Sequence, residues 1–348
     1  MKDLVKKLSE SFGPSGSEDQ IRSIIRSEVE QYADEIRVDA MGNLICRVAP
    51  KNTAPVLRSA PGAAPKRIMV DAHMDEIGIV VSYIDDKGFV RFSPVGGLNP
   101  HVLLGQKVVF ADGTVGVFGT EKLDDIKDLK FDKMFIDIGA RDRAEAQAKV
   151  RVGDAAAMVS TFADMGVRVS GKAMDDRIAC LVLIEAMRRA RPGVHEVYYV
   201  FAVQEELGLR GARTAAYGIN PDVGIAVDVT LWGDTPEHAP FNVALGGGAA
   251  IKAKDASLIA HPAVKNLMID AAEKNGIPYQ LEVLERGGTD AGVIALTREG
   301  VPSGTISVPC RYVHTPVEMV DMGDVDACVR LLVAVVEELA SPAGGGIL

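Results

Sequence analysis

The stretch EVYYVFAVQEELG, residues 196–208, decides the fold prediction. Its first eight residues are mostly apolar and rich in β-branched and aromatic side chains, which predicts a buried strand. The strand runs into two adjacent carboxylates, Glu205 and Glu206. Taken alone, such a pair also fits a solvated loop. However, binding groups in open α/β sheets collect at the carboxyl ends of strands, and neighbouring side chains there point in different directions. One glutamate could therefore hold a metal while the other moves a proton.

Length and composition indicate a folded, acidic protein. The chain has 348 residues, enough for two domains, with 47% hydrophobic and 25% charged residues. Its net charge of −10 disfavours nucleic acid as a partner, and no apolar run approaches the roughly 18 residues that span a membrane. The four cysteines show no CxxC spacing, and the N-terminus lacks a secretory core. We therefore expect reduced, mostly buried cysteines in a cytoplasmic protein.

The first part of the chain predicts helices followed by a hairpin and a strand. Residues 1–33 are predicted to be helical, with Ser17 and Gln20 as a capping box. A hairpin should follow over residues 36–48. Residues 51–66, rich in Pro and Ala, are expected to form an exposed loop before the strand 67–72.

The pattern then changes to short alternating strands with many glycines. This pattern extends from residue 77 to about residue 164 and predicts a small all-β unit, a barrel or a sandwich. Helix–strand alternation returns afterwards, from a helix over residues 177–190 to a long C-terminal helix over residues 322–339. We therefore predict an α/β domain, residues 1–76 plus 165–348, interrupted by an inserted β domain, residues 77–164.

Two polar clusters flank this insert. His73 and Asp75 follow the strand 67–72, and residues two apart in extended chain face the same side. Asp75 can therefore support the imidazole of His73, as carboxylates do behind metal-bound histidines. Asp175 and Asp176 precede a helix. Asp176 fits a helix-start charge equally well, whereas Asp175 lies just outside the helix and is free to point elsewhere.

Two further candidates complete a possible metal site. Asp228 ends another apolar run, where a charge is costly unless it is paired or metal-bound, and His314 follows the strand 304–308 and a short loop. A two-metal site needs a bridging carboxylate and, on each ion, a histidine and a carboxylate. Two histidines and three carboxylates supply that set: His73, Asp175, Glu206, Asp228 and His314. Glu205 is then the remaining acid, able to take a proton from an activated water.

At this point the sequence resembles the peptidase M42 family of metal-dependent aminopeptidases. The matching stretches run in the family's order from residue 72 to residue 314 and are AHMDE (72–76), GKAMDDR (171–177), QEELG (204–208), DVT (228–230), GDTP (233–236), GTDA (288–291) and YVH (312–314). The resemblance implies His73 and Asp228 on one metal, Glu206 and His314 on the other, and Asp175 bridging. It also implies Glu205 as general base and Asp75 behind His73.

The resemblance further implies a mixed-sheet domain with helices on both faces and an inserted β domain used for dimerisation. We expect two divalent ions per subunit, Zn²⁺ or Co²⁺, short peptides as substrates, and homo-oligomers from a dimer to a tetrahedral dodecamer. The alternatives are a related two-metal deacylase, an endoglucanase, as some family members have been labelled, and a scaffold that kept its metals for stability. The sequence leaves open whether acidic or aliphatic N-terminal residues are preferred.

Overall fold

Four parallel strands form the centre of the larger part of the molecule. The computed structural model describes residues 1–51, 64–237 and 241–347. The four strands lie side by side in the order β12 (Glu196–Ala202), β3 (Arg67–His73), β13 (Val223–Thr230) and β16 (Ser303–Arg311). They are almost entirely buried, as expected of parallel strands covered on both faces.

Antiparallel strands extend this centre into an 11-stranded mixed sheet. On one side lie β2 (Leu44–Val48) and β1 (Glu35–Val38), which form the predicted hairpin. The other strands are β17 (Glu318–Asp321), β11 (Arg168–Gly171), β10 (Ala163–Asp164), β14 (Ala249–Lys254) and β15 (Tyr279–Val283). The predicted mixed sheet is therefore confirmed.

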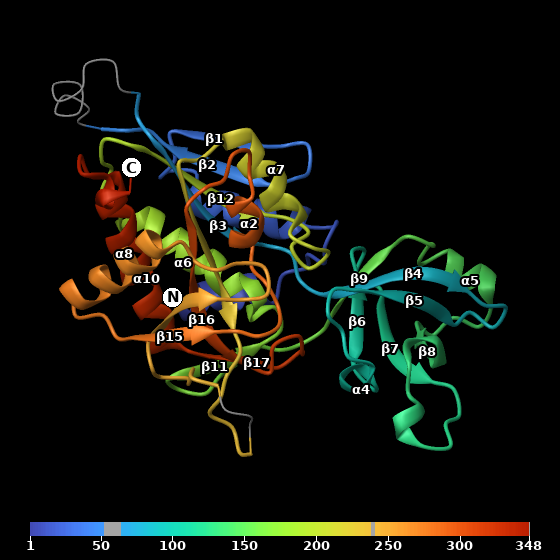
Figure 1. Cartoon of the computed structure of the whole chain (residues 1–348). Helices are drawn as coiled ribbons and strands as arrows, with labels where there is room; N and C mark the ends of the chain where they lie inside the picture. Colours follow the sequence, from blue (N-terminus) through green and yellow to red (C-terminus); the bar gives the residue numbers. More distant parts are fainter. Residues whose placement is uncertain (52–63, 238–240, 348) are drawn as a thin grey trace.

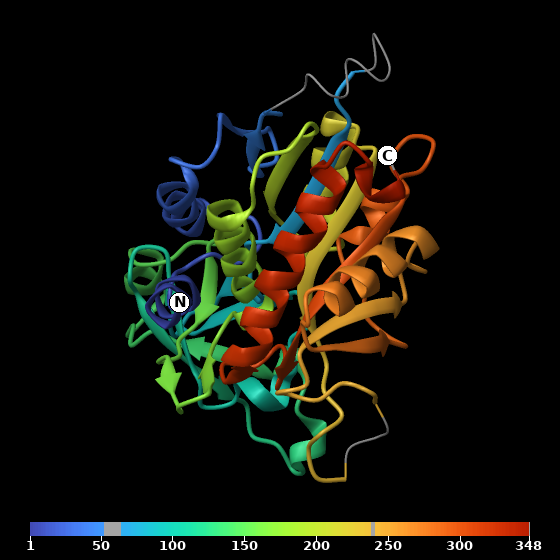
Figure 2. The same cartoon turned by 90° about the vertical axis from the view of Figure 1, so that its left-hand side faces the viewer.

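Helices cover both faces of the sheet. One face packs on α1 (Lys2–Ser9), α2 (Asp19–Val29), α6 (Met174–Arg189), α8 (Pro262–Lys274) and α10 (Met322–Ala340). Figure 2 shows α10 running across this face. The other face packs on α7 (Arg210–Ile219) and α9 (Ala291–Ala295). Strand β3 follows the alternation expected of a strand, because Ile68 and Val70 face the first set of helices and Met69 faces the second.

The predicted all-β unit is a closed barrel beside the large sheet (Figure 1). Its strands are β4 (Gly78–Ile84), β5 (Val90–Val95), β6 (Lys107–Phe110), β7 (Val115–Thr120), β8 (Met134–Asp137) and β9 (Ala155–Met158). Four short helices accompany them: α4 (Pro100–Leu103), η1 (Ile126–Asp128), η2 (Phe131–Lys133) and α5 (Arg143–Gln147). The barrel encloses a hydrophobic core of its own. Strand β10, at the end of the predicted insert, pairs with β11 of the large sheet.

The N-terminal segment differs from the prediction of continuous helix. Residues 10–18 separate α1 from α2, and Glu18 rather than Ser17 is the N-cap of α2, without a side-chain capping bond. The reason is a buried ionic cluster that this segment covers. Arg177, only 1% exposed, donates hydrogen bonds to backbone carbonyls of residues 8, 11 and 13 and lies 3.4 Å from Glu76. If the helix continued through residues 10–18, these carbonyls would accept backbone N–H groups of the helix instead of the guanidinium of Arg177.

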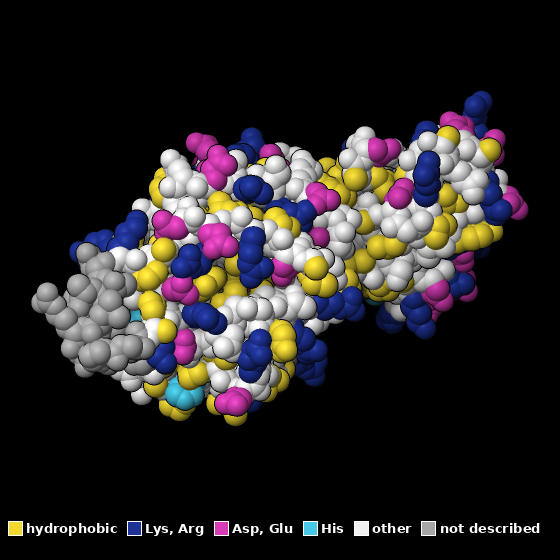
Figure 3. Space-filling model, turned by 90° about the horizontal axis from the view of Figure 1, so that it is seen from above, with side chains coloured by type: hydrophobic (Ala, Val, Ile, Leu, Met, Phe, Trp, Pro, Cys, Tyr) yellow, Lys and Arg dark blue, Asp and Glu magenta, His cyan; other side chains and the backbone are white. Residues whose placement is uncertain are grey.

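The surface is mixed in charge, and all four cysteines are free and buried. Figure 3 shows two lobes with acidic and basic side chains scattered over both. Among the described residues, no helix is both long enough and apolar enough to cross a membrane. The predicted loop over residues 51–66 lies mostly outside the described residues.

Candidate metal centre

The predicted site residues meet at one end of the central strands. His73 ends β3, Asp228 lies near the end of β13, and His314 follows β16 after a short turn. Asp175 and Asp176 lie at the start of α6, and Glu205 and Glu206 lie in the turn between β12 and α7. Parallel strands bring their carboxyl ends to the same sheet edge, so residues up to 241 positions apart converge.

His73 is held from behind by Asp75. Its Nδ1 lies 3.3 Å from the Asp75 carbonyl oxygen and 3.4 Å from the carboxylate Oδ1. Ser15 donates a hydrogen bond to the other carboxylate oxygen of Asp75 at 2.5 Å. Both side chains, His73 and Asp75, are buried. The ring therefore presents Nε2 to the centre of the site, as predicted for a histidine supported by a carboxylate.

Asp175 lies between the two histidines. One carboxylate oxygen is 3.1 Å from Nε2 of His73, and the other is 3.3 Å from Nε2 of His314. Glu318 fixes this arrangement, because its carboxylate accepts the backbone N–H groups of both Asp175, at 3.0 Å, and His314, at 2.8 Å. Asp175 therefore faces both histidines at once, one with each carboxylate oxygen.

The two glutamates diverge within the β12–α7 turn, and Asp75 supports this turn too. Its carboxylate accepts the backbone N–H of Glu205 at 3.0 Å and that of Glu206 at 3.3 Å. Glu206 points to His314, with Oε1 3.3 Å from Nε2. Glu205 points to His73, with Oε2 3.9 Å from Nε2. Adjacent residues in this turn thus face different histidines.

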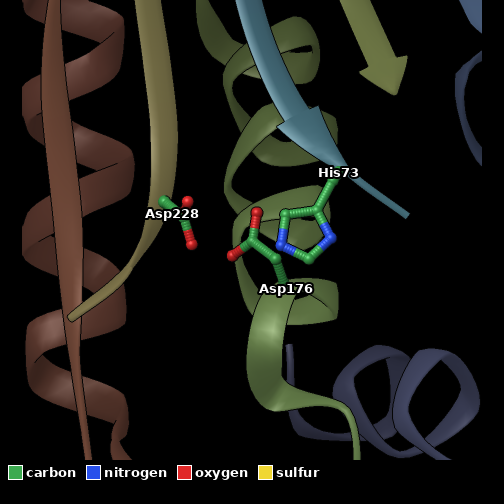
Figure 4. A group of neighbouring side chains, drawn as sticks. All are labelled: His73, Asp176 and Asp228. Atoms are coloured by element: carbon green, nitrogen blue, oxygen red, sulfur yellow. The ribbon is translucent and has the colours of Figure 1, made fainter. Parts of the chain in front are cut away.

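Asp228 lies beside a carboxylate that the sequence left ambiguous. Potential ligand atoms of His73, Asp176 and Asp228 lie within 4.8 Å of one another, and those of His73, Asp175 and Glu206 form a second such group. Figure 4 shows His73 at the end of β3, Asp228 on β13 and Asp176 at the start of α6, converging on one space. Asp176 is fully buried, and neither of its oxygens has a hydrogen-bond partner among the described residues. It is therefore more than a helix-start charge.

The excess of carboxylates shifts the pKa of almost every group in the site. Burial, reinforced by neighbouring carboxylates, raises the pKa of Glu205, Glu206 and Asp228. Burial disfavours the charged ring of His314, but the carboxylates of Asp175 and Glu206 outweigh burial and raise its pKa to about 12. A buried group of carboxylates with so few cations is stabilised by bound metal.

A second carboxyl pair lies deeper in the same region, and the sequence analysis did not identify it. Asp71 and Asp290 are buried and interact with each other, and burial raises the pKa of both. Asp71 precedes His73 by two residues on β3, and Asp290 is the N-cap of α9. The signal available was Asp71 itself, a charge inside an otherwise apolar strand, which burial makes costly.

The site opens into a cavity of about 550 Å³. Beyond the candidate ligands, the cavity is lined by glycines of the segment 286–292, by apolar side chains such as Leu231 and Leu284, and by Lys252 and Arg286. Gly287 and Gly288 of this segment bring backbone without side chains to the cavity wall. His101, His195 and His261 are not among the lining residues, and His238 lies outside the described residues.

Comparisons with known proteins find relatives that are similar over most of the chain. A family model described as M42 glutamyl aminopeptidase matches residues 56–331. A putative aminopeptidase from Acetivibrio thermocellus is 51% identical over 334 residues, covering 96% of this chain and 97% of that protein. Aminopeptidase APDkam598 from the archaeon Desulfurococcus kamchatkensis has a TM-score of 0.92 at 39% identity, covering 99% and 96% of the two chains.

A further solved structure is the Pyrococcus horikoshii TET1 peptidase, described as able to assemble into a tetrahedron or a large octahedral shell. It has a TM-score of 0.83 at 32% identity and covers 98% of this chain and 99% of that chain. These matches extend over both the large sheet and the barrel, since each structure covers nearly the whole chain.

Proposed function

Because the chain belongs to the M42 family of aminopeptidases, and is therefore a peptide-bond hydrolase, we propose that it removes N-terminal residues from short peptides using two divalent cations. The observation that carries the proposal is the buried group of carboxylates around two histidines whose Nε2 atoms face each other across Asp175.

The donor set fits two cations. In the proposal His73 and Asp228 would hold one, Glu206 and His314 would hold the other, and Asp175 would be the carboxylate shared by both. Zn²⁺ and Co²⁺ both suit mixed imidazole and carboxylate ligands. Asp176 borders the His73–Asp228 position and adds negative charge there without a hydrogen-bond partner in the described chain. When bound, the cations would make a water acidic enough to attack at neutral pH and would stabilise charge developing on the substrate carbonyl.

Glu205 is the proposed proton carrier. Burial, the nearby Asp228 and Asp290, and its neighbour Glu206 raise the pKa of its carboxyl well above the usual range, although the charge of His73 opposes this shift. An acid with a raised pKa can exchange protons near neutral pH. Glu205 takes the proton of the attacking water and later donates one to the leaving amine, so that the amine departs uncharged. Asp75 keeps the backbone of Glu205 and the ring of His73 in place throughout.

The deciding experiment compares substrates with free and acetylated α-amino groups, before and after chelation. An aminopeptidase should cleave aminoacyl anilides with a free amine, lose this activity on dialysis against chelator and regain it with Co²⁺ or Zn²⁺. Equal hydrolysis of acetylated substrates would favour the deacylase. Full activity in preparations that elemental analysis shows to be metal-free would contradict the two-cation proposal.

The same assays before and after chelation distinguish the endoglucanase alternative from the aminopeptidase. A glycosidase needs two carboxylates flanking the sugar bond and no metal. Hydrolysis of a β-glucan that persists after chelation would support it, and the acidic groups around His73 and His314 would then need another explanation. If the protein is instead a scaffold that kept its metals for stability, it should bind both cations but hydrolyse neither aminoacyl anilides nor β-glucan.

We also propose that the chain forms a homo-oligomer through its barrel and works in the cytoplasm. The structural match to the P. horikoshii peptidase, which is described as assembling into shells, extends over the barrel as well as the large sheet. This match supports the proposed homo-oligomer. The four buried free cysteines support a reducing compartment. Residues 77–164 remain the predicted bounds of the assembly domain.

A further inference from the structure

The two histidines of the site are supported from different parts of the molecule. The outer nitrogen of His73, Nδ1, faces Asp75, which belongs to the large α/β part as His73 does. The outer nitrogen of His314 faces the barrel instead. It lies 3.1 Å from the carbonyl oxygen of Gly97, a residue 217 positions away that follows strand β5.

This contact decides which nitrogen of His314 is available to a cation. A carbonyl oxygen only accepts hydrogen bonds, so Nδ1 of His314 must carry a proton and donate it to Gly97. Nε2 is then the nitrogen that can give up its proton and bind metal, and it already faces Asp175 and Glu206. A partner on the outer nitrogen fixes the tautomer and orientation of a ligand histidine, and it is part of the site's design.

The contact requires glycine at two consecutive positions. A Cβ atom on Gly97 would lie 2.5 Å from Nδ1 of His314, far inside van der Waals contact. Gly96 has a φ of +79°, a region that favours glycine, and a Cβ atom there would lie 2.6 Å from Cγ2 of Ile77 and 2.9 Å from Oε2 of Glu206. The turn Gly96–Gly97 thus lies directly against both ligands proposed for one cation, Glu206 and His314.

We propose that the Gly96–Gly97 turn of the barrel is a positioning element for one of the two cation positions only. The position formed by His73 and Asp228 is complete within the large α/β part, whereas the position formed by Glu206 and His314 is completed by the barrel. The inserted unit therefore shapes the active site as well as providing surface for assembly. This inference rests on the proposed two-cation function.

The test is a titration of the metal-free full-length protein with Co²⁺. Binding is measured by calorimetry and by the visible absorption of the bound cobalt. The wild type should bind two equivalents. In Gly97→Ala the methyl group displaces the His314 ring, so one equivalent should bind as in the wild type and the other about 10–100-fold more weakly, the usual loss when a supporting partner of a ligand is removed. His314→Ala should weaken the same step, which assigns it.

Matched controls separate positioning from general damage. Gly218→Ala makes the same change in α7 at a position with open space around it, and it should leave both binding steps unchanged. Light scattering should show that each variant keeps the wild-type oligomeric state. If Gly97→Ala does not fold, Gly96→Ala replaces it, because its methyl group presses on Glu206 and should weaken the same step.

Three outcomes are decisive. Selective weakening of the step assigned by His314→Ala supports the inference. The inference is overturned if folded Gly97→Ala binds both Co²⁺ equivalents as the wild type does, or if it binds both equally more weakly. A wild type that binds fewer than two equivalents contradicts the proposed function itself, so that failure is distinguishable from failure of this inference.

Discussion

At the scale of single residues, Glu205 and Glu206 are the clearest pair, because adjacent carboxylates face different histidines. Glu205→Gln removes the titratable oxygen and keeps the size of the side chain. We expect a loss of about 10²–10⁴ in kcat, the usual contribution of general acid–base catalysis, with both cations retained. Glu206→Gln replaces a charged ligand by a neutral one, so we expect metal content to fall towards one ion per chain. Elemental analysis beside kcat measures both effects.

The reverse pattern would contradict these roles. If Glu205→Gln loses a cation while Glu206→Gln keeps both, the assignments are exchanged between the neighbours. If neither variant changes rate or metal content, the pair takes no part in catalysis or metal binding. Glu285→Gln, which changes an exposed carboxylate outside the cavity lining, is the control and should change neither quantity.

Lys252 indicates which side chain the cavity accepts. Apart from the candidate ligands, the charged residues lining the cavity are Lys252 and Arg286, both positive. Lys252 is fully buried and donates a 2.5 Å hydrogen bond to Glu282, which is not part of the lining. That bond uses one of the three donors of an ammonium group, and Arg286 has no ion pair among the described residues. We therefore predict faster cleavage of N-terminal glutamate than of N-terminal glutamine.

The measurement is the ratio of kcat/KM for glutamyl and glutaminyl anilides. Lys252→Met should lower this ratio about tenfold or more, the value of a hydrogen bond to a charged group. Lys254→Met, on the same strand but outside the cavity lining, should leave the ratio unchanged. A wild type that prefers leucyl substrates, with no change in Lys252→Met, would show that Lys252 serves only its ion pair with Glu282.

The candidate ligands could be predicted because each follows a recognisable strand or begins a helix. His73 and Glu206 needed only the position of an apolar run and the rule that sites collect at strand ends, whereas Asp175 was found from its place beside a helix start. Asp176 could not be separated from a helix-start charge, because its role depends on Asp228, which is distant in sequence. Gly97 could not be predicted as a partner of His314, because that contact depends on how the barrel docks on the sheet.

At the scale of elements, the β1–β2 hairpin supports the turn that carries the glutamates. Asn43, fully buried, accepts the backbone N–H of Val203 at 3.0 Å and donates to the carbonyl of Gly211 at 3.0 Å. It thus joins the end of β12 to the start of α7 across the turn that holds Glu205. A remote hairpin residue therefore fixes the backbone on which the proposed base lies.

Asn43→Ala should destabilise the protein and lower kcat. The buried N–H of Val203 would lose its partner, which costs about 1–3 kcal/mol. Denaturant unfolding should show this loss, and the rate should fall because the Glu205 turn loosens. Asn275→Ala also removes a side-chain bond to a carbonyl, that of Ala271, but at a helix end far from the turn, and should leave kcat unchanged. Wild-type stability in Asn43→Ala would exclude a supporting role.

The elements themselves were largely predictable, and the exception is informative. Helix α2 lies within the predicted helical region 1–33, and its residues Ile21, Ile25 and Val29 form one buried face. The capping box at Ser17 was wrong, since residues 10–18 leave helical geometry to give carbonyls to Arg177 and a hydroxyl from Ser15 to Asp75. Capping rules consider only neighbouring residues, so they miss contacts with residues distant in the chain such as Arg177 and Asp75.

At the scale of the whole molecule, we predict a homo-oligomer joined through the barrel. Multi-angle light scattering should give a mass of at least twice the 37.0 kDa of one chain. Exposed apolar side chains on the barrel, such as Val115 and Val152, are candidates for the contact. A charged residue at Val152 should lower the mass and leave cation binding unchanged. A monomer at every metal concentration would refute the assembly.

The division into two parts was predicted from glycine-rich alternating strands, with residues 77–164 as the inserted part. Strand β10 falls inside the predicted insert yet pairs with the large sheet, because two residues carry too little pattern to assign to either part. Closure of the barrel was also undecided between barrel and sandwich. Closure depends on the β4–β9 and β6–β9 pairings between strands far apart in the chain.

The chain enters and leaves the barrel through neighbouring strands, since β4 and β9 pair with each other. A domain whose ends lie next to each other can be gained, lost or exchanged without changing the strand order of the sheet into which it is inserted. The Gly96–Gly97 turn limits that freedom, because any replacement module would have to offer a carbonyl oxygen at the same point beside His314. In evolutionary terms, the outer surface of such a module can change freely, whereas the Gly96–Gly97 turn is constrained by its close contacts with Glu206 and His314.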